Sequence, residues 1–339
     1  MKTTLRRLWQ FLERENLHRL LGLMTVIIVV SALAISLVEP DITPLNGFWW
    51  TIVTMTTVGY GDISPHSIGG RVIAVIVMLF GIGLLGMFSA TVASVLVQHK
   101  LREERGLTAH RYHNHIVLCE WNHRTRAILH DLRLDPKIAE RPIVLIADLD
   151  SKPVEDDNLY FVSGEVNDET LGRANIAEAE TVVILGDDRL DPTARDAKVV
   201  LATLTAESIN RNVYTIVELV SDANIRHVRR ASADEVVVNN TVTSGLLARA
   251  ALDHGITKVI SEWLSLEYGD ELYKLLAPAS LVGQSFVDVL AHMKRQYGSI
   301  VIGVQRGTTG DVISNPPFDY VLAAGDLVII VAPERPKIT

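Results

Sequence analysis

The stretch that decides the fold reads Thr57-Val58-Gly59-Tyr60-Gly61, followed directly by Asp62. Its two glycines can adopt left-handed backbone angles at low steric cost, which allows consecutive peptide carbonyls to point the same way. A helix start precedes the stretch, because Thr43 suits an N-cap and Pro44 suits the first turn. The sequence therefore predicts a short helix over residues 44–56, whose negative C-terminal end favours a nearby cation.

Two apolar runs flank this region, over residues 20–38 and 72–99, and neither contains a charged side chain. Each run is long enough to cross the roughly 30 Å of hydrocarbon in a bilayer. Basic residues precede the first run, so a cleaved signal peptide is the alternative interpretation of that run. The second run favours a pair of membrane spans instead.

With these flanks, residues 57–61 resemble the selectivity filter of potassium channels. The resemblance implies that four chains meet around one axis and that their backbone carbonyls replace the water shell of a dehydrated K⁺. A nonselective cation channel is the nearest alternative, and Tyr60 after Gly59 favours K⁺ selectivity. The filter residues implied are Thr57, Val58, Gly59, Tyr60 and Gly61.

The same resemblance assigns roles around the filter. It implies that Trp49 and Trp50 brace the filter and that the Trp49 indole donates a hydrogen bond to Asp62. Val53 occupies a position where many relatives carry Glu, so no carboxyl pair with Asp62 is expected. In the second span, Gly83 aligns with the gating hinge of the family. Gly81 and Gly86 fit helix packing better.

The charge distribution orients the chain. Basic residues precede the first span and follow the second, whereas the loop between them carries Glu39, Asp41 and Asp62, so both termini are expected in the cytoplasm and the protein in the cell inner (plasma) membrane. The formal net charge of −8 comes from residues after 106, which argues against a nucleic-acid partner. The single cysteine, Cys119, lies in an apolar run and is expected to be a core thiol.

From residue 115 onward, short apolar runs alternate with helical stretches, which predicts a doubly wound parallel sheet. The six expected strands are 116–119, 143–147, 159–162, 181–185, 213–219 and 235–238. Here the chain resembles RCK domains, the regulators of potassium conductance, in stretches such as Ser163-Gly164-Glu165 and Ala174-Asn175-Ile176. The expected fold class is thus a tetrameric two-span α-helical pore with a cytoplasmic α/β Rossmann-like RCK domain and a small α+β C-terminal lobe.

The two resemblances divide the chain into segments. The expected segments are a cytoplasmic segment 1–19, a pore domain 20–97 (spans 20–38 and 72–97, pore helix 44–56), a linker 98–113, an RCK Rossmann-like domain 114–240, interface and crossover helices 241–268, and a C-terminal lobe 269–335.

The same resemblances imply how copies of the chain assemble. They imply RCK–RCK dimers in a gating ring, a homotetramer through the pore, and contact with membrane lipid.

Carboxylates collect where the expected strands end. Because the carboxyl ends of parallel strands line the ligand crevice, these side chains form a candidate ligand site. Oxygen ligands suit Ca²⁺ or another divalent cation, and Glu218, Asp187 and Asp188 are the candidate metal ligands. Helix-capping or solvated acids are the alternative. The candidate ligand-binding residues are Glu120, Asp148, Asp187, Asp188 and Glu218, with Glu165 at the same edge.

A nucleotide is the alternative ligand. It would need G-x-G-x-x-G after the first strand, and residues 120–125 read Glu-Trp-Asn-His-Arg-Thr instead. Nearby, His110, His113, His115 and His123 could suggest a metal, but linker and surface positions are expected for them.

We therefore expect a ligand-gated K⁺ channel and not an enzyme. A membrane-tethered nucleotide-dependent enzyme is the alternative of another class. The missing glycines and the absence of a plausible catalytic dyad in this sequence argue against it. A transporter regulatory subunit would lack a pore of its own.

Overall fold

The computed structural model describes residues 17–307 and 310–337, and divides the chain into two compact units, Met1–Glu104 and Arg105–Thr339. Residues 1–16 of the expected cytoplasmic segment 1–19 lie outside the described residues. The basic residues Lys2, Arg6, Arg7 and Arg14 belong to this part.

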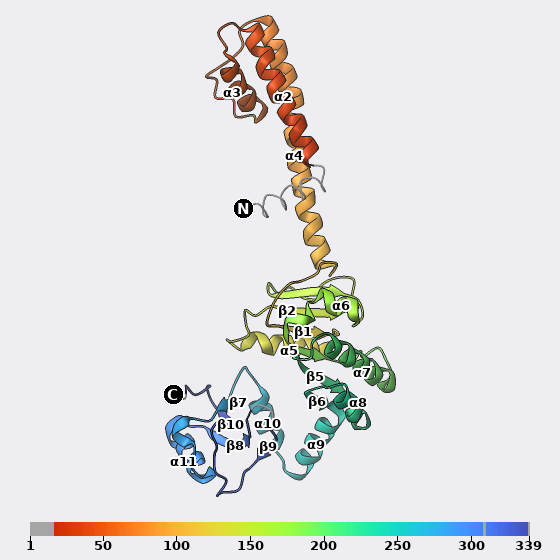
Figure 1. Cartoon of the computed structure of the whole chain (residues 1–339), viewed down its shortest axis with the longest axis vertical. Helices are drawn as coiled ribbons and strands as arrows, with labels where there is room; N and C mark the ends of the chain where they lie inside the picture. Colours follow the sequence, from red (N-terminus) through yellow and green to blue (C-terminus); the bar gives the residue numbers. More distant parts are fainter. Residues whose placement is uncertain (1–16, 308–309, 338–339) are drawn as a thin grey trace. The chain divides into compact units, whose positions relative to one another are not determined.

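In the part of the first unit that the structure describes, there are three helices (Figure 1): α2 (Leu17–Val38), α3 (Pro44–Met55) and α4 (Ile68–Glu104). Thr43 is the N-cap of α3, and its side chain accepts a hydrogen bond from the Asn46 amide. The helices pack through a core of Ile35, Ile42, Trp50, Ala74 and Val77. Among the described residues, α2 and α4 are the helices long and apolar enough to cross a membrane.

The second unit begins with a six-stranded parallel sheet in the order β3-β2-β1-β4-β5-β6. This is the strand order of doubly wound nucleotide-binding folds. The strands are β1 (His115–Cys119), β2 (Ile143–Ala147), β3 (Leu159–Ser163), β4 (Ala179–Ile184), β5 (Tyr214–Leu219) and β6 (Glu235–Val238). The helices that follow them are α5 (His123–Leu134), α6 (Asp168–Arg173), α7 (Pro192–Ile209) and α8 (Ile225–Arg230). Short 3₁₀ turns are η1 (Ile176–Glu178) and η2 (Asp222–Asn224).

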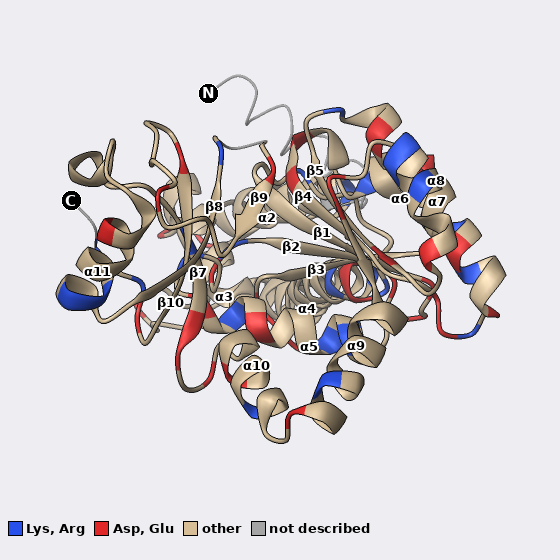
Figure 2. Ribbon diagram, turned by 90° about the horizontal axis from the view of Figure 1, so that it is seen from below, with Lys and Arg blue, Asp and Glu red and all other residues tan. Residues whose placement is uncertain are grey.

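Alternate strand residues build two separate cores, one on each face of this sheet. Val117 and Cys119 of β1 share a fully buried core with side chains of α6, α7 and α8. Ile116 and Leu118 face the other way and pack with Leu129 of α5. Acidic and basic residues both occur on α6 and α7 (Figure 2).

Two helices, α9 (Asn239–Leu252) and α10 (Ile256–Leu264), lead from this sheet to a smaller lobe. The lobe is an antiparallel sheet in the order β7-β10-β8-β9, with α11 packed through Val289 and Met293. Its elements are β7 (Glu271–Leu276), η3 (Ala279–Leu281), α11 (Phe286–Tyr297), β8 (Ile300–Gln305), β9 (Val312–Ser314) and β10 (Leu327–Ala332). The two long apolar helices, the Rossmann-like parallel sheet and the small α+β lobe confirm the expected fold class of one chain.

Candidate functional site

The stretch after α3 has an unusual backbone. Thr57, Gly59 and Gly61 all have positive φ angles, of 62°, 57° and 74°. The amides of Val58 and Gly59 donate to the carbonyl of Val53 at the end of α3, at 3.1 and 3.4 Å. These bonds tie the first part of the stretch to the end of α3 through its amides.

Trp49 holds the outer part of this stretch. Its indole Nε1 donates to Asp62 Oδ2 at 2.9 Å, the hydrogen bond that the sequence led us to expect. The Trp49 ring also stacks on Tyr60, with centroids 5.9 Å apart and planes 5° apart. Trp50 lies elsewhere, because it is buried against Ile35 and Val77 of the two long helices. Trp49 thus contacts the stretch, and the bracing role of Trp50 stays a prediction.

The glycines of α4 differ in their surroundings. A Cβ on Gly81 would lie 2.7 Å from Met55 Cγ, so Gly81 allows α3 and α4 to pack closely. Nothing lies within 4 Å of such an atom on Gly83 or Gly86 within one chain. Helix α4 runs without interruption through Gly83, so the hinge role of Gly83 stays a prediction.

Glu39 makes a polar contact with Ser67 that the sequence did not reveal. Its carboxylate is only 7% exposed and accepts hydrogen bonds from Ser67 Oγ at 2.7 Å and from the Ser67 amide at 2.8 Å. These bonds hold the pKa of Glu39 below its ordinary value. Glu39 thereby ties the end of α2 to the start of α4.

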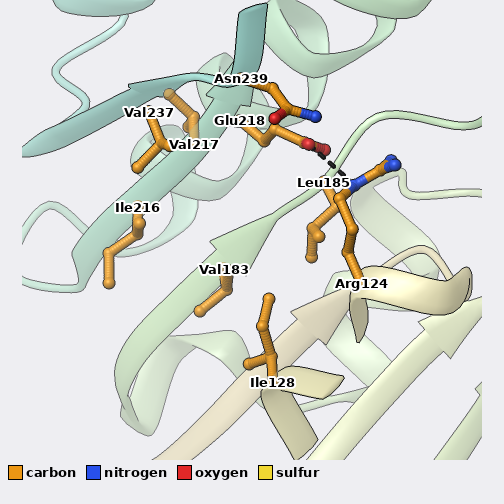
Figure 3. A pocket seen from close by; sticks show the side chains of 9 residues that line it. All are labelled: Arg124, Ile128, Val183, Leu185, Ile216, Val217, Glu218, Val237 and Asn239. Atoms are coloured by element: carbon orange, nitrogen blue, oxygen red, sulfur yellow. Dashed lines mark ion pairs between the residues drawn. The ribbon is translucent and has the colours of Figure 1, made fainter. Parts of the chain in front are cut away.

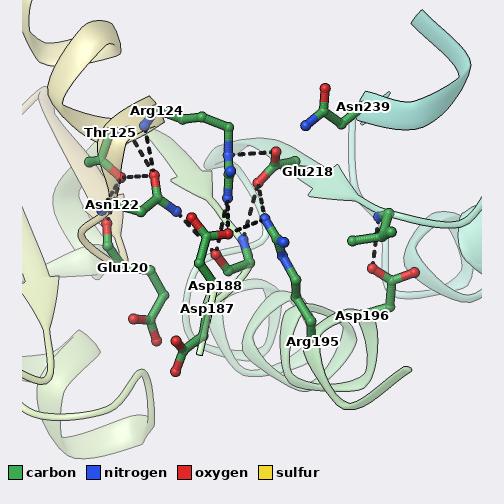
Figure 4. A network of polar contacts seen from close by, with 12 residues as sticks. Glu120, Asn122, Arg124, Thr125, Asp187, Asp188, Arg195, Asp196, Glu218 and Asn239 are labelled. Atoms are coloured by element: carbon green, nitrogen blue, oxygen red, sulfur yellow. Dashed lines mark hydrogen bonds and ion pairs between the residues drawn. The ribbon is translucent and has the colours of Figure 1, made fainter. Parts of the chain in front are cut away.

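The carboxyl edge of the parallel sheet brings candidate acids together, and Figure 4 shows Glu120, Asp187, Asp188 and Glu218 there. Arg124 joins two of them, with Nε 2.8 Å from Glu218 Oε1 and Nη2 2.7 Å from Asp188 Oδ1. Arg195 lies across the same pair, 2.6 Å from Asp188 and 3.6 Å from Glu218. Burial would raise the pKa of Asp188, but the two guanidinium groups hold it below its ordinary value.

A second group of charges lies around Lys198. Its Nζ is 2.9 Å from Glu120 Oε1, 3.3 Å from Asp187 Oδ2 and 3.5 Å from Glu165 Oε1. Arg189 forms a two-pronged pair with Asp187 and also reaches Asp148 at 3.3 Å. The Arg189 hydrogen bonds hold the pKa of Asp187 well below its usual range, whereas burial raises the pKa of Glu120.

The structure therefore pairs every candidate acid of this edge with a basic side chain. Within residues 17–307 and 310–337, no group of three or more His, Cys, Asp or Glu side chains is arranged to hold a metal ion. The sequence analysis missed the basic partners because each lies on a helix or loop, where a charged side chain is ordinarily solvated. A divalent cation would have to displace guanidinium or ammonium groups from these carboxylates.

The start of α5, where a phosphate would bind in a nucleotide-binding fold, is already capped. The Asn122 side chain accepts from the amides of Arg124 and Thr125, at 2.9 and 3.0 Å. Glu120 has a φ of 74°, an angle that glycine adopts more readily. The chain thus keeps the tight turn of the fold, but its own Asn122 side chain occupies the backbone amides that would otherwise bind a phosphate.

An apolar cavity of about 220 Å³ adjoins Glu218 (Figure 3). It lies on the sheet face that carries α5, and Arg124 and Ile128 of α5 line it together with the strands. Its floor consists of Val183, Ile216 and Val237, from β4, β5 and β6. Parallel sheets ordinarily have both faces covered, so this cavity marks a surface that one chain leaves open.

The expectation of surface positions is wrong for two of the histidines. His115 is fully buried in β1 with Nε2 2.8 Å from the Ala174 carbonyl, and burial lowers its pKa. His110 is buried with Nε2 3.1 Å from the Phe161 carbonyl. Backbone carbonyls satisfy these rings, which a sequence pattern cannot reveal. His113 and His123 are exposed, as expected. Cys119 is a buried core thiol, and burial raises its pKa.

Three family models match the chain. Residues 23–98 match a family described as ion channel, and residues 111–217 match the calcium-activated potassium channel slowpoke-like RCK domain. Residues 240–339 match Castor and Pollux, part of voltage-gated ion channel.

Whole proteins are also similar. The calcium-gated potassium channel TvoK of Thermoplasma volcanium is 31% identical over 86% of this chain and 83% of its own length. The putative potassium channel protein YugO of Bacillus subtilis is 29% identical over 84% of this chain and 86% of its own length. Among solved structures, the GsuK channel covers 94% of this chain and 57% of its own, with a TM-score of 0.50 and 19% identity, a likeness that shows the fold alone.

Proposed function

Because this chain belongs to the family of potassium channels that carry a cytoplasmic RCK domain, we propose that four copies form a K⁺-selective pore whose opening is controlled by a ligand at the carboxyl edge of the parallel sheet. A divalent cation such as Ca²⁺ is the favoured ligand. The family consists of ion channels and not of enzymes. The observation that carries the proposal is the backbone of residues 57–61, in which the amides of Thr57, Val58 and Gly59 donate to carbonyls at the end of α3.

The pore chemistry follows from that backbone. Four copies of Thr57, Val58, Gly59, Tyr60 and Gly61 would surround one axis with rings of carbonyl oxygens that replace the hydration shell of K⁺. The hydrogen bond and ring contact of Trp49 keep this stretch from collapsing inward. The C-terminal end of α3 adds partial negative charge behind it.

The exposed surface of a single chain supports a tetramer. Tyr60 is 67% exposed in one chain, and Val58 and Trp49 are exposed as well. Large apolar side chains so close to a filter are expected to be covered by neighbouring copies in the membrane. The loop acids Glu39, Asp41 and Asp62 face the outside, and Lys100, Arg102 and Arg105 lie on the cytoplasmic side, with both termini.

Helices α9 and α10 support pairing between RCK domains. Neither helix buries a single residue within the chain, and Val242, Leu247, Leu252 and Leu264 are all exposed. A second copy that covers these helices would give the RCK–RCK pairs of a gating ring.

Control by a divalent cation would work through competition. A cation bound to Glu218 and Asp188 would release Arg124 of α5 and Arg195 of α7. Both helices could then shift relative to β5. Support comes from the carboxylate-rich edge and from the name of the relative TvoK, a calcium-gated channel.

A small anionic ligand such as a nucleotide is the second candidate. Four basic side chains, Arg124, Arg189, Arg195 and Lys198, lie at the same edge. The capped start of α5 and the carboxylate of Glu120 weigh against this candidate.

The test is ⁸⁶Rb⁺ flux into liposomes that contain the full chain, titrated with Ca²⁺, Mg²⁺ and nucleotides. Glu218→Gln should raise the Ca²⁺ concentration for half-activation about tenfold or more, because the site loses a charged ligand. The matched control is Glu180→Gln, which removes an exposed acid paired with Arg141 near the opposite end of the sheet. A response to nucleotide alone, or an identical Ca²⁺ response in Glu218→Gln, would contradict the divalent site.

A further inference from the structure

The segment between α4 and β1 is not a free linker. Residues 106–114, which we call the strap, belong to the cytoplasmic unit and lie along the edge strand β3 and the end of α6. The Gly106 carbonyl accepts from the Ser163 amide at 3.1 Å, and the His110 amide donates to the Arg173 carbonyl at 2.8 Å. At its far end, the Asn114 amide donates to the Glu178 carbonyl at 2.8 Å.

Side chains fix the middle of the strap. The Tyr112 ring packs on Tyr160 of β3, with centroids 4.3 Å apart. The Asn175 side chain donates to the Tyr112 carbonyl at 2.8 Å. His110 reaches the Phe161 carbonyl, so the strap also covers the polar edge that β3 would otherwise expose.

Arg173 is the residue that clamps the start of the strap. Its guanidinium donates to the Gly106 carbonyl and, at 3.4 Å, to the Ser163 carbonyl, so one side chain bonds both the strap and the strand beneath it. Its own carbonyl accepts the His110 amide. Arg173 therefore contacts the strap at two points.

Gly106 is the residue of the strap that the Arg173 guanidinium binds. Its φ is 62°, in the left-handed region that favours glycine. A Cβ there would lie 2.4 Å from the Ser163 nitrogen and 2.7 Å from Phe161 Cδ1. Any side chain at this position would lift the strap off β3.

Helix α4 ends at Glu104, so the connection between α4 and the strap consists of Arg105 alone. One residue spans at most about 3.6 Å. We propose that Arg173 and Gly106 anchor the strap as a coupling element, so that a movement of the RCK domain is passed to α4 without slack. The proposal rests on the channel function and not on the identity of the gating ligand.

The anchoring is tested by hydrogen–deuterium exchange of the full chain in liposomes. Arg173→Ala and Gly106→Ala should each speed exchange of residues 106–114 by about tenfold to hundredfold, because charge-assisted or tightly packed backbone bonds are lost. Exchange of β1 should stay unchanged, which verifies that the domain is folded. Unchanged exchange of the strap in both variants would overturn the anchor.

The matched control is Arg133→Ala. Arg133 also clamps a loop, through Asp156 and the carbonyls of Ile138, Ala139 and Arg141, but it has no bond to the strap. This variant should destabilise its own loop and leave exchange of residues 106–114 as in the parent chain.

The coupling is tested by ⁸⁶Rb⁺ flux in the same liposomes. Arg173→Ala should give the same basal flux as a chain with two glycines inserted after Arg105, and both should differ from the parent chain and from Arg133→Ala. Parental flux in Arg173→Ala, with a rapidly exchanging strap, would overturn the coupling. If the parent chain does not respond to added Ca²⁺, the divalent proposal fails while this comparison still decides the role of the strap.

Discussion

Asp187 is the most strongly held acid of the carboxyl edge. Arg189 binds both of its oxygens at 3.0 Å, and Lys198 lies 3.3 Å away. Because these cations lower the pKa of Asp187 in the folded protein, its stabilising effect is fully present above the ordinary Asp pKa of about 3.9. That effect is lost only as the pH falls further, through the lowered value.

Asp187→Asn should therefore reduce the free energy of opening of β4 by about 1–3 kcal/mol at pH 7. Hydrogen exchange of β4 against pH measures this. The deficit should remain constant from about pH 7 to pH 5 and close only below about pH 4. The control Asp148→Asn removes a more exposed acid and should change stability by less than about 1 kcal/mol. A deficit that closes near pH 6 would contradict the proposed charge state.

The hydrogen bond between Trp49 and Asp62 could be predicted, because the resemblance to potassium-channel filters implies it. The contact between Glu39 and Ser67 could not, because it joins two segments 28 residues apart without a recurring pattern. The acids of the sheet edge were predictable from the strand ends. Their partners Arg124, Arg195 and Lys198 were not, because a basic residue on a helix reveals neither its direction nor its neighbours.

At the scale of elements, α9 is the clearest sign of a missing neighbour. An isolated helix of its length is marginal in water, and its apolar side chains Val242, Leu247 and Leu252 are exposed within the chain. Leu247, which is 65% exposed, is a suitable probe.

Leu247→Asp in the full chain should speed hydrogen exchange of α9 and α10 about tenfold or more, because a charge in an apolar interface disrupts the pair. Val287→Asp, on the exposed side of α11, is the matched control and should leave α9 unchanged. Equal exchange of α9 in the parent chain and Leu247→Asp would contradict pairing through this helix.

Element types were predictable because hydrophobic periodicity specifies them, and each expected strand is present. Some ends differed. Helix α7 ends at Ile209, and Ala206 in its last turn still contributes to the core. Helix α4 continues to Glu104 through charged residues that had suggested a linker. The docked strap was not predictable, since its bonds are mostly between backbone groups.

At the scale of the whole molecule, the chain combines an ion-channel unit, with two helices long and apolar enough to cross a membrane, and an RCK unit, and the two have separate cores. Membership of the family follows from similarity along most of the chain, whereas the proposed K⁺ selectivity would depend on five residues whose carbonyls would have to form a ring. Gly59 has one of the left-handed backbone angles of this stretch.

The most direct measurement is the reversal potential of the reconstituted full chain in opposed K⁺ and Na⁺ gradients. The filter backbone predicts a reversal close to the K⁺ equilibrium potential, and Gly59→Ala, which strains the left-handed position, should abolish K⁺ current or shift the reversal toward zero. A permeability ratio near one in the unaltered chain would contradict the account.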